Sequence, residues 1–265
     1  MIDARRGVLY PARMPQFHRL PPPTAAAHLI AWFWIPEWDI EPGSASRQHV
    51  VAYPALNLVV EKTQGAAARV QLVGATTAGT HRDLRGSGWA VGALLRPASV
   101  SALAENPAGL RDTAVEFDAP ELAGGVDRAM APGGENGRVA AVAEFARWLT
   151  RRVGETTPTD ALANEMSELL VTDGTILRAE DAAARLHMSL RTMQRLAHRY
   201  VGLPPAAMIR RRRLQEAAQR LRDEPGVELA LVAAELGYAD HSHLSNDFRA
   251  VLGITPRSYR SDARA

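Results

Sequence analysis

The C-terminal part of the sequence repeats itself at an offset of 51 residues. The matched positions are those that begin, pack and end a helix: Ser189 and Asp240, Met193 and Leu244, Ala197 and Phe248, Gly202 and Gly253, and Pro205 and Pro256. Ser and Asp cap helix N-termini, and Gly followed by Pro ends a helix. A generic helical bundle does not require this coincidence at one fixed offset. The repeat therefore constrains the chain to two copies of one helical unit.

Each copy has the form of a helix-turn-helix. Apolar residues recur at helical spacing over 193–200, 214–221 and 229–236, which predicts one buried stripe on each helix. The expected turns lie at 186–188 and 237–239, and a second, capped helix follows each turn. A helix from about 205 to 222 joins the units. At 1.5 Å per residue it would be about 27 Å long, which is comparable with one DNA turn of roughly 34 Å.

The outward faces of the two capped helices predict contact with double-stranded DNA. The residues left outside the first apolar stripe are Arg191, Thr192, Gln194, Arg195 and Arg199, and those outside the second are His241, Ser242, Ser245, Asn246 and Arg249. Arg and Gln pair with guanine and adenine edges in the major groove. Recognition helices read bases mainly with their N-terminal turns, where most of these residues lie.

Charge supports this interpretation without deciding it. The net charge is +2, but residues 189–222 carry +8 between flanking segments of −4 (160–188) and −3 (223–265). A locally basic surface attracts phosphate. The alternative is a solvated helix face with a bias toward Arg, since Lys62 is the single Lys of the chain.

The N-terminal half has a different pattern of apolar residues, which predicts a mainly-β domain. Short apolar runs bounded by turn formers lie at 29–35, 50–53, 56–60, 70–73 and 89–95. A turn-rich break at 131–137 precedes an amphipathic helix over about 138–153 and a linker at 154–158. We therefore expect an α+β multidomain chain with a mainly-β domain at 1–137, a helix and linker at 138–158, and an all-α domain at 159–265.

Three tryptophans of the N-terminal half are candidates for a ligand pocket. Trp32, Trp34 and Trp38 are separated by even numbers of residues and would share one face of a strand. With Arg96 as an anion partner, they could line a site for a small molecule. The competing interpretation is a plain barrel core.

Other chemistry finds little support. Cys is 0, so no thiolate site or Cys nucleophile exists. The early histidines (18, 28, 49 and 81) have no metal-ligand spacing, and His241 and His243 would not face together on a helix. Catalytic residues, metals and cofactors are not predicted. The longest apolar run, 29–35, is far shorter than the about 20 residues of a membrane span, and no signal segment follows Arg5 and Arg6, so we expect a cytoplasmic protein.

The stretch from Gly237 to Arg260, GYADHSHLSNDFRAVLGITPRSYR, resembles the signature of AraC/XylS-type transcriptional regulators. The segments 189–195, 202–205 and 213–218 extend the resemblance to about 160–262. It implies a seven-helix domain with two helix-turn-helix units. It also implies base contacts by Arg191, Gln194 and Arg195 and by His241, Ser242 and Asn246, with Thr192 and Arg249 at phosphates. Such regulators often have a basic residue where Asn246 stands, so we expect the second unit either to bind DNA weakly or to tolerate many sequences.

The N-terminal half more weakly resembles the sensor domains of such regulators, over 31–38, 56–60 and 91–97. The resemblance implies a cupin-like β-barrel that binds a small-molecule effector and a homodimer formed through a helix. The helix at 138–153 is the candidate for pairing. Its Trp148 fits either a dimer contact, which we favour, or the core.

Together these features predict a sequence-specific DNA-binding transcription regulator, controlled by a small-molecule effector or by dimerisation, with RNA polymerase as a further candidate partner. One alternative is a β-barrel enzyme fused to a helical domain. Another is a regulator whose N-terminal domain only makes protein contacts.

Overall fold

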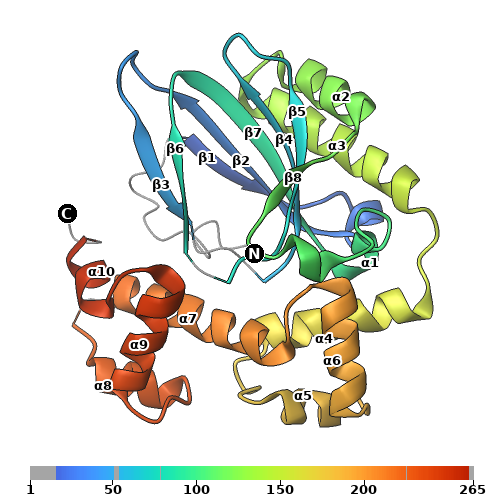
Figure 1. Ribbon diagram of the computed structural model, residues 1–265. Coiled ribbons are helices and arrows are strands. Elements are labelled where there is room, and N and C mark those ends of the chain that lie inside the picture. Colours follow the sequence, from blue (N-terminus) through green and yellow to red (C-terminus); the bar gives the residue numbers. More distant parts are fainter. Residues whose placement is uncertain (1–15, 51–53, 78, 225, 263–265) are drawn as a thin grey trace.

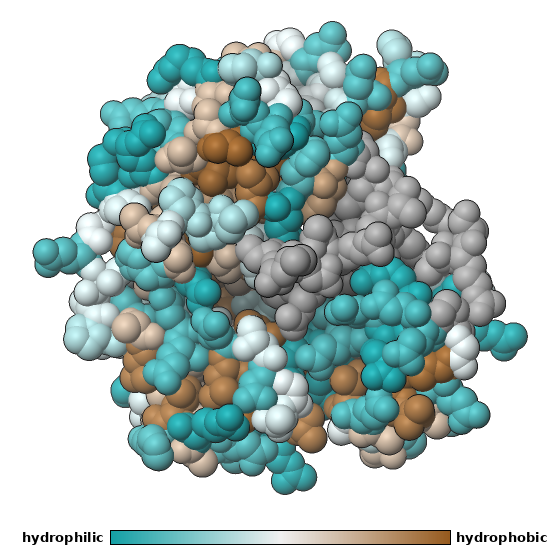
Figure 2. Space-filling model, turned by 180° about the vertical axis from the view of Figure 1, so that it is seen from behind, coloured by the Kyte–Doolittle hydropathy of each residue, from teal (hydrophilic) through white to brown (hydrophobic). Residues whose placement is uncertain are grey.

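A computed structural model describes residues 16–50, 54–77, 79–224 and 226–262. A β-rich half comes first in the chain and an all-helical half follows it (Figure 1). The expected order of a mainly-β domain and an all-α domain is thus confirmed. Viewed from behind, the surface is mostly hydrophilic, with scattered hydrophobic patches (Figure 2). No described helix is long and apolar enough to cross a membrane.

The strands form two antiparallel sheets. The larger has the order β1 (Gln16–Leu20), β2 (Ile30–Asp39), β7 (Ser87–Leu95), β4 (Asn57–Thr63), β5 (Arg69–Val73) and β8 (Ala114–Glu116), and the smaller pairs β3 (Ser46–Val50) with β6 (Thr80–Leu84). Among the described residues no ladder closes either sheet into a barrel. Strands β2, β4, β5 and β7 match the expected runs. The run at 50–53 lies, except for Val50, outside the described residues.

Two helices, α2 (Pro120–Met130) and α3 (Gly134–Val153), cover one face of the larger sheet (Figure 1). Alternate residues of β2 point toward them, and Phe33 packs edge-on against Phe145 at 5.3 Å between ring centroids. Trp148 is 9% exposed and packs edge-on against Phe117. Our preference for Trp148 as a dimer contact is therefore wrong. Helix α3 packs its apolar face on the sheet. Without this contact, the apolar side chains of the helix and of the sheet would be exposed to water.

The opposite face of the larger sheet carries the smaller sheet. Glu61 on β4 is 1% exposed and accepts hydrogen bonds from Arg69 on β5 and Arg82 on β6. Burial raises the pKa of the Glu61 carboxyl, but the two guanidinium groups outweigh this and hold its pKa below the ordinary value. A buried carboxylate paired in this way stays ionised and ties the two sheets together.

Short helical segments complete the β-rich half. They are η2 (Thr24–Ala26), α1 (Pro97–Val100) and η3 (Pro107–Leu110). Within residues 158–262, position 225 aside, the helical half has seven helices: α4 (Pro158–Thr172), α5 (Ala179–Arg185), α6 (Leu190–Tyr200), α7 (Pro205–Asp223), α8 (Leu229–Glu235), α9 (His241–Leu252) and α10 (Pro256–Asp262). This is the arrangement that the resemblance implies.

The two helix-turn-helix units are α5–α6 and α8–α9, at either end of α7 (Figure 1). Their cores are separate: α7 contributes Met208 and Ile209 to the first and Leu214 and Leu221 to the second. The repeat seen in the sequence has a structural counterpart. Helices α7 and α10 each begin at the repeated Pro, and the repeated Gly has a positive φ of 80° in the first unit and 75° in the second.

The β-rich half contacts both units. On α4, the Asn164 side chain donates to the carbonyl of His28 at 2.7 Å and accepts from the backbone N–H of Ala98 at 2.9 Å. After α6, the carbonyl of Gly202 accepts from Arg111 at 3.2 Å. At the second unit, a Cβ on Gly79 would lie 3.0 Å from the carbonyl oxygen at the end of α9. The helical half is thus held at both ends of α7.

Candidate nucleic-acid interface

The first recognition helix, α6, is placed by its cap and its stripe. The Ser189 hydroxyl accepts from the backbone N–H of Thr192 at 3.1 Å, which fixes the start of the helix. The stripe formed by Met193, Leu196, Ala197 and Tyr200 is buried. Because one face is committed to the core, the opposite face must point outward.

That outward face contains most of the residues expected to read bases. Arg191, Gln194 and Arg195 are all exposed, and their three side chains lie on the first two turns of α6. Thr192 differs from the expectation of a phosphate contact in one respect. Its hydroxyl lies 2.9 Å from that of Ser189, so this side chain is engaged in the cap.

The second recognition helix, α9, has the same construction. Asp240 accepts from the backbone N–H of His243 at 2.8 Å, and this hydrogen bond lowers the pKa of the Asp240 carboxyl. Of the residues expected to contact DNA from this helix, His241, Ser242, Asn246 and Arg249 are all exposed, and His243 is exposed beside them. An ionised cap beside this face makes it less positive than that of α6, where the cap is a neutral serine.

Four consecutive arginines at 210–213 point in different directions, because successive residues of a helix are about 100° apart. Two of them contact the second unit. The Arg210 guanidinium donates to Asp247 on α9 at 2.6 Å. That of Arg213 lies 3.8 Å from the ring centroid of Tyr238, in the turn before α9.

The other two arginines are buried. Arg211 is 3% exposed and donates to the carbonyl of Thr76 in the β-rich half, and burial lowers its pKa to about 10. Arg212 is 1% exposed and donates to the carbonyls of Asp173 and Ile176 between α4 and α5. The charge of +8 over 189–222 therefore overstates the positive charge available at the surface.

Two of the four ligand-pocket candidates come together where the halves meet. Trp32 and Arg96 line a small cavity of about 90 Å³ that α4 closes from the other side. One nitrogen of Arg96 donates to Glu168 on α4 at 2.7 Å. The guanidinium of Arg19 lies 4.9 Å from the centroid of the Trp32 ring.

The other two tryptophans lie elsewhere. Trp34 packs on Gly92 and Trp38 on Gly88, its partners across β7, where a Cβ would lie 2.1 and 2.6 Å from the indole rings. Their role is mainly to fill the second face of the sheet.

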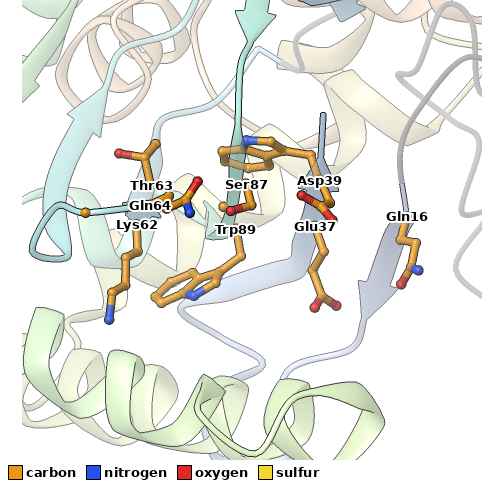
Figure 3. A pocket seen from close by; sticks show the side chains of 11 residues that line it. Gln16, Glu37, Asp39, Lys62, Thr63, Gln64, Ser87 and Trp89 are labelled. Atoms are coloured by element: carbon orange, nitrogen blue, oxygen red, sulfur yellow. The ribbon is translucent and has the colours of Figure 1, made fainter. Parts of the chain in front are cut away.

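Trp38 also lines a hollow of about 700 Å³ at the ends of β2, β4 and β7 (Figure 3). Two charged side chains of this hollow, Glu37 and Lys62, are already paired at 2.7 Å with Arg138 and Asp127 of the covering helices. These ion pairs attach the helices to the sheet.

Some residues that matter to the site carry no signal in the sequence. Thr76, Pro107 and Asn164 hold the two halves together, yet no local pattern marks them. Arg178, exposed just before α5, lines the same groove as Gln194 of α6 and His243 of α9, and no sequence pattern predicts this. Among the described residues, no group of three His, Cys, Asp or Glu side chains is arranged to hold a metal ion.

Two family models match separate parts of the chain. The model of a helix-turn-helix domain matches residues 182–262, and that of a domain of unknown function (DUF6597) matches residues 18–116. The HTH-type transcriptional activator RhaS of Pectobacterium carotovorum is 32% identical over 81 residues, 31% of this chain and 29% of that protein. The HTH-type transcriptional regulator VirS of Mycobacterium tuberculosis is 42% identical over 84 residues, 31% of this chain and 24% of that protein. The match thus spans less than a third of each of these relatives.

Solved structures give more distant likenesses. A transcriptional regulator from Chromobacterium violaceum, described by its AraC-type DNA-binding domain, has a TM-score of 0.34 at 25% identity, over 40% of this chain and 92% of that chain. ToxT from Vibrio cholerae has a TM-score of 0.41 at 10% identity, over 92% of this chain and 95% of that chain.

Proposed function

We propose, on the premise that the C-terminal domain is an AraC-type helix-turn-helix domain, that this protein is a sequence-specific DNA-binding transcription regulator. The observation that carries the proposal is the pair of matched exposed faces. Each lies on the N-terminal turns of a capped helix, and the two helices stand at either end of α7. Such an arrangement suits two successive major-groove segments on one side of a duplex.

In this proposal Arg191, Gln194 and Arg195 contact bases from α6, and His241, Ser242 and Asn246 contact bases from α9. Arg249 contacts a phosphate. We assign the Thr192 hydroxyl mainly to the helix cap. Only the flank of this residue would touch a phosphate of the DNA. The outward face of α6 has three arginines, Arg191, Arg195 and Arg199, whereas α9 begins beside an ionised Asp240. The first unit is therefore expected to supply most of the affinity.

Arg195→Ala is expected to weaken binding to a specific site by about 1–3 kcal/mol, as for a bidentate base contact, with little effect on random DNA. The measurement is a fluorescence-anisotropy titration of the full chain with the upstream region of its own gene and with a random duplex. Arg151→Ala, which removes an exposed arginine of α3, is the control. Equal losses on both DNAs would overturn the base contact and leave a phosphate contact.

We further propose that the cavity between the halves receives a small anionic effector. Arg96 would bind its carboxylate in place of Glu168, and Trp32 would contact its apolar part. The Arg96–Glu168 ion pair joins the halves, so an anion that replaces Glu168 would loosen α4 from the β-rich half. A ligand that binds the two arrangements unequally shifts the population between them.

Butanoate and benzoate are suitable probes, because the cavity is small and has one guanidinium. Each is expected to raise the melting temperature of the full chain as its concentration rises. Glu168→Gln removes the competing carboxylate and should enlarge the rise, whereas Arg96→Gln should abolish it. A rise that persists in Arg96→Gln would contradict the assignment.

The remaining expectations belong to the same proposal. No catalytic activity is proposed, and the protein would act in the cytoplasm with RNA polymerase as a candidate partner. A homodimer formed through α3 would use its outer face, where Val139 is 51% exposed. If neither probe binds, the anionic effector is contradicted, and a β-rich half that makes only protein contacts becomes the favoured alternative.

A further inference from the structure

A groove of about 520 Å³ separates the two helix-turn-helix units. Both recognition helices contribute to it, α6 through Gln194 and α9 through His243. Because Gln194 is one of the proposed base-reading residues, the groove lies beside the face that would meet DNA. Its charged lining comes mainly from the start of α5 and the middle of α7.

The groove presents three guanidinium groups. Arg178 is exposed, and among the described residues no hydrogen bond or ion pair holds its guanidinium group. Arg210 is 43% exposed while it bonds to Asp247, and Arg213 lies against Tyr238. The acidic groups in the lining are Glu180 and Asp247. The guanidinium groups of the lining therefore outnumber its carboxylates.

The geometry of DNA says what would face this groove. When two recognition helices occupy successive major grooves on one side of a duplex, the minor groove between them turns toward the protein. Both of its walls are phosphate backbone. The middle of the protein surface then meets phosphates rather than base edges, and guanidinium groups suit such contacts.

We infer that this groove binds the DNA backbone between the two base-reading segments, with Arg178 and Arg210 as phosphate contacts. This inference rests on the proposed function. In the free protein Asp247 holds Arg210, and a phosphate replaces that carboxylate when DNA binds. Neither arginine is among the residues that the sequence analysis assigns individually to DNA, although Arg210 belongs to the basic block at 189–222.

The test measures how binding of the full chain depends on salt, between about 50 and 200 mM, on the gene's upstream region and on random DNA. Each lost phosphate contact should reduce the slope of log affinity against log salt by about 0.9. Arg178→Gln and Arg210→Gln should each do so on both DNAs. Asp247→Asn should strengthen binding to both DNAs at low salt, because it frees Arg210.

Arg220→Gln is the matched control. Arg220 lies on the same helix and is similarly exposed at 39%, but it pairs with Glu224 and Glu235 away from the groove. Its slope should equal that of the unchanged protein. Thermal unfolding of every variant verifies its folding, and Arg178→Gln breaks no ion pair within the described part of the chain.

The outcomes separate the two proposals. If the unchanged protein binds neither DNA, the proposed function fails and the groove contact fails with it. If it binds, but Arg178→Gln and Arg210→Gln have the slope of Arg220→Gln, the groove contact alone is overturned. If Asp247→Asn weakens binding to the upstream region only, Asp247 positions α9 and does not compete with phosphate.

Discussion

Gly202→Ala is expected to destabilise the protein and to separate its two halves. At a φ of +80° any side chain is strained, at a cost of about 1 kcal/mol. In addition, the new Cβ would lie 2.6 Å from the carbonyl oxygen of Pro107. That atom belongs to the backbone of η3 and cannot rotate away. Overpacking of this kind costs a further amount of about 1–3 kcal/mol.

The repeat supplies the matched control. Gly253 occupies the equivalent position of the second unit with a φ of +75°, but no described atom lies within 4 Å of its Cβ position. Gly253→Ala should therefore show the backbone cost alone. Urea unfolding measures the two losses, and proteolysis within the linker at 154–157 reports separation of the halves. Equal losses with equal cleavage would mean that the contact with Pro107 contributes nothing.

Arg212→Met is expected to destabilise the first helix-turn-helix unit by about 2–4 kcal/mol, because methionine keeps much of the buried length but has no donor. The buried carbonyl of Ile176 would then lose its guanidinium donor, which is costly, whereas the half-buried carbonyl of Asp173 would keep only the backbone N–H of Ile176 at 3.2 Å. Because these carbonyls position the segment that leads into α5, binding of α6 to DNA should weaken as well.

Arg220→Met tests whether this loss comes from burial or from charge. It removes the same charge from the same helix, but at an exposed position whose ion pairs contribute little. Urea unfolding and anisotropy titration should show a much smaller loss of stability and of affinity. The structural role of Arg212 is contradicted if both variants lose the same stability. It is also contradicted if Arg212→Met lowers the affinity for DNA no more than Arg220→Met, which removes the same charge.

The helical half could be predicted almost completely from the sequence, because its signals are local. The cap at Ser189, the stripe that follows and the stop at Gly202 lie within 14 residues of one another. The helix expected at 205–222 is α7, Pro205–Asp223. The helix expected at 138–153 begins four residues earlier, at Gly134, because the second half of the predicted turn, which includes Gly134 and Gly137, is helical.

The β-rich half was predicted less completely. Strands β3 and β6 carry polar residues such as Arg47 and Asp83, and they form because they pair with each other, these two residues across 36 positions of the chain. Helix α2 contains Gly124 and Gly125, which have poor helix propensity. The sequence feature that still indicates the start of this helix is Pro120 at its first position, followed by an acidic residue.

The sequence by itself determined where the two recognition helices begin and end and which side chains they expose. Caps, stripes and stops act between residues a few positions apart, so they can be read from the chain directly. The tertiary structure decided what the arginines of α7 and the tryptophans of β2 contact. Arg211 donates a hydrogen bond to Thr76 across 135 positions, and Trp32 lines the same cavity as Arg96 beside α4. No local pattern encodes such partners, because their positions depend on how separately formed elements pack together.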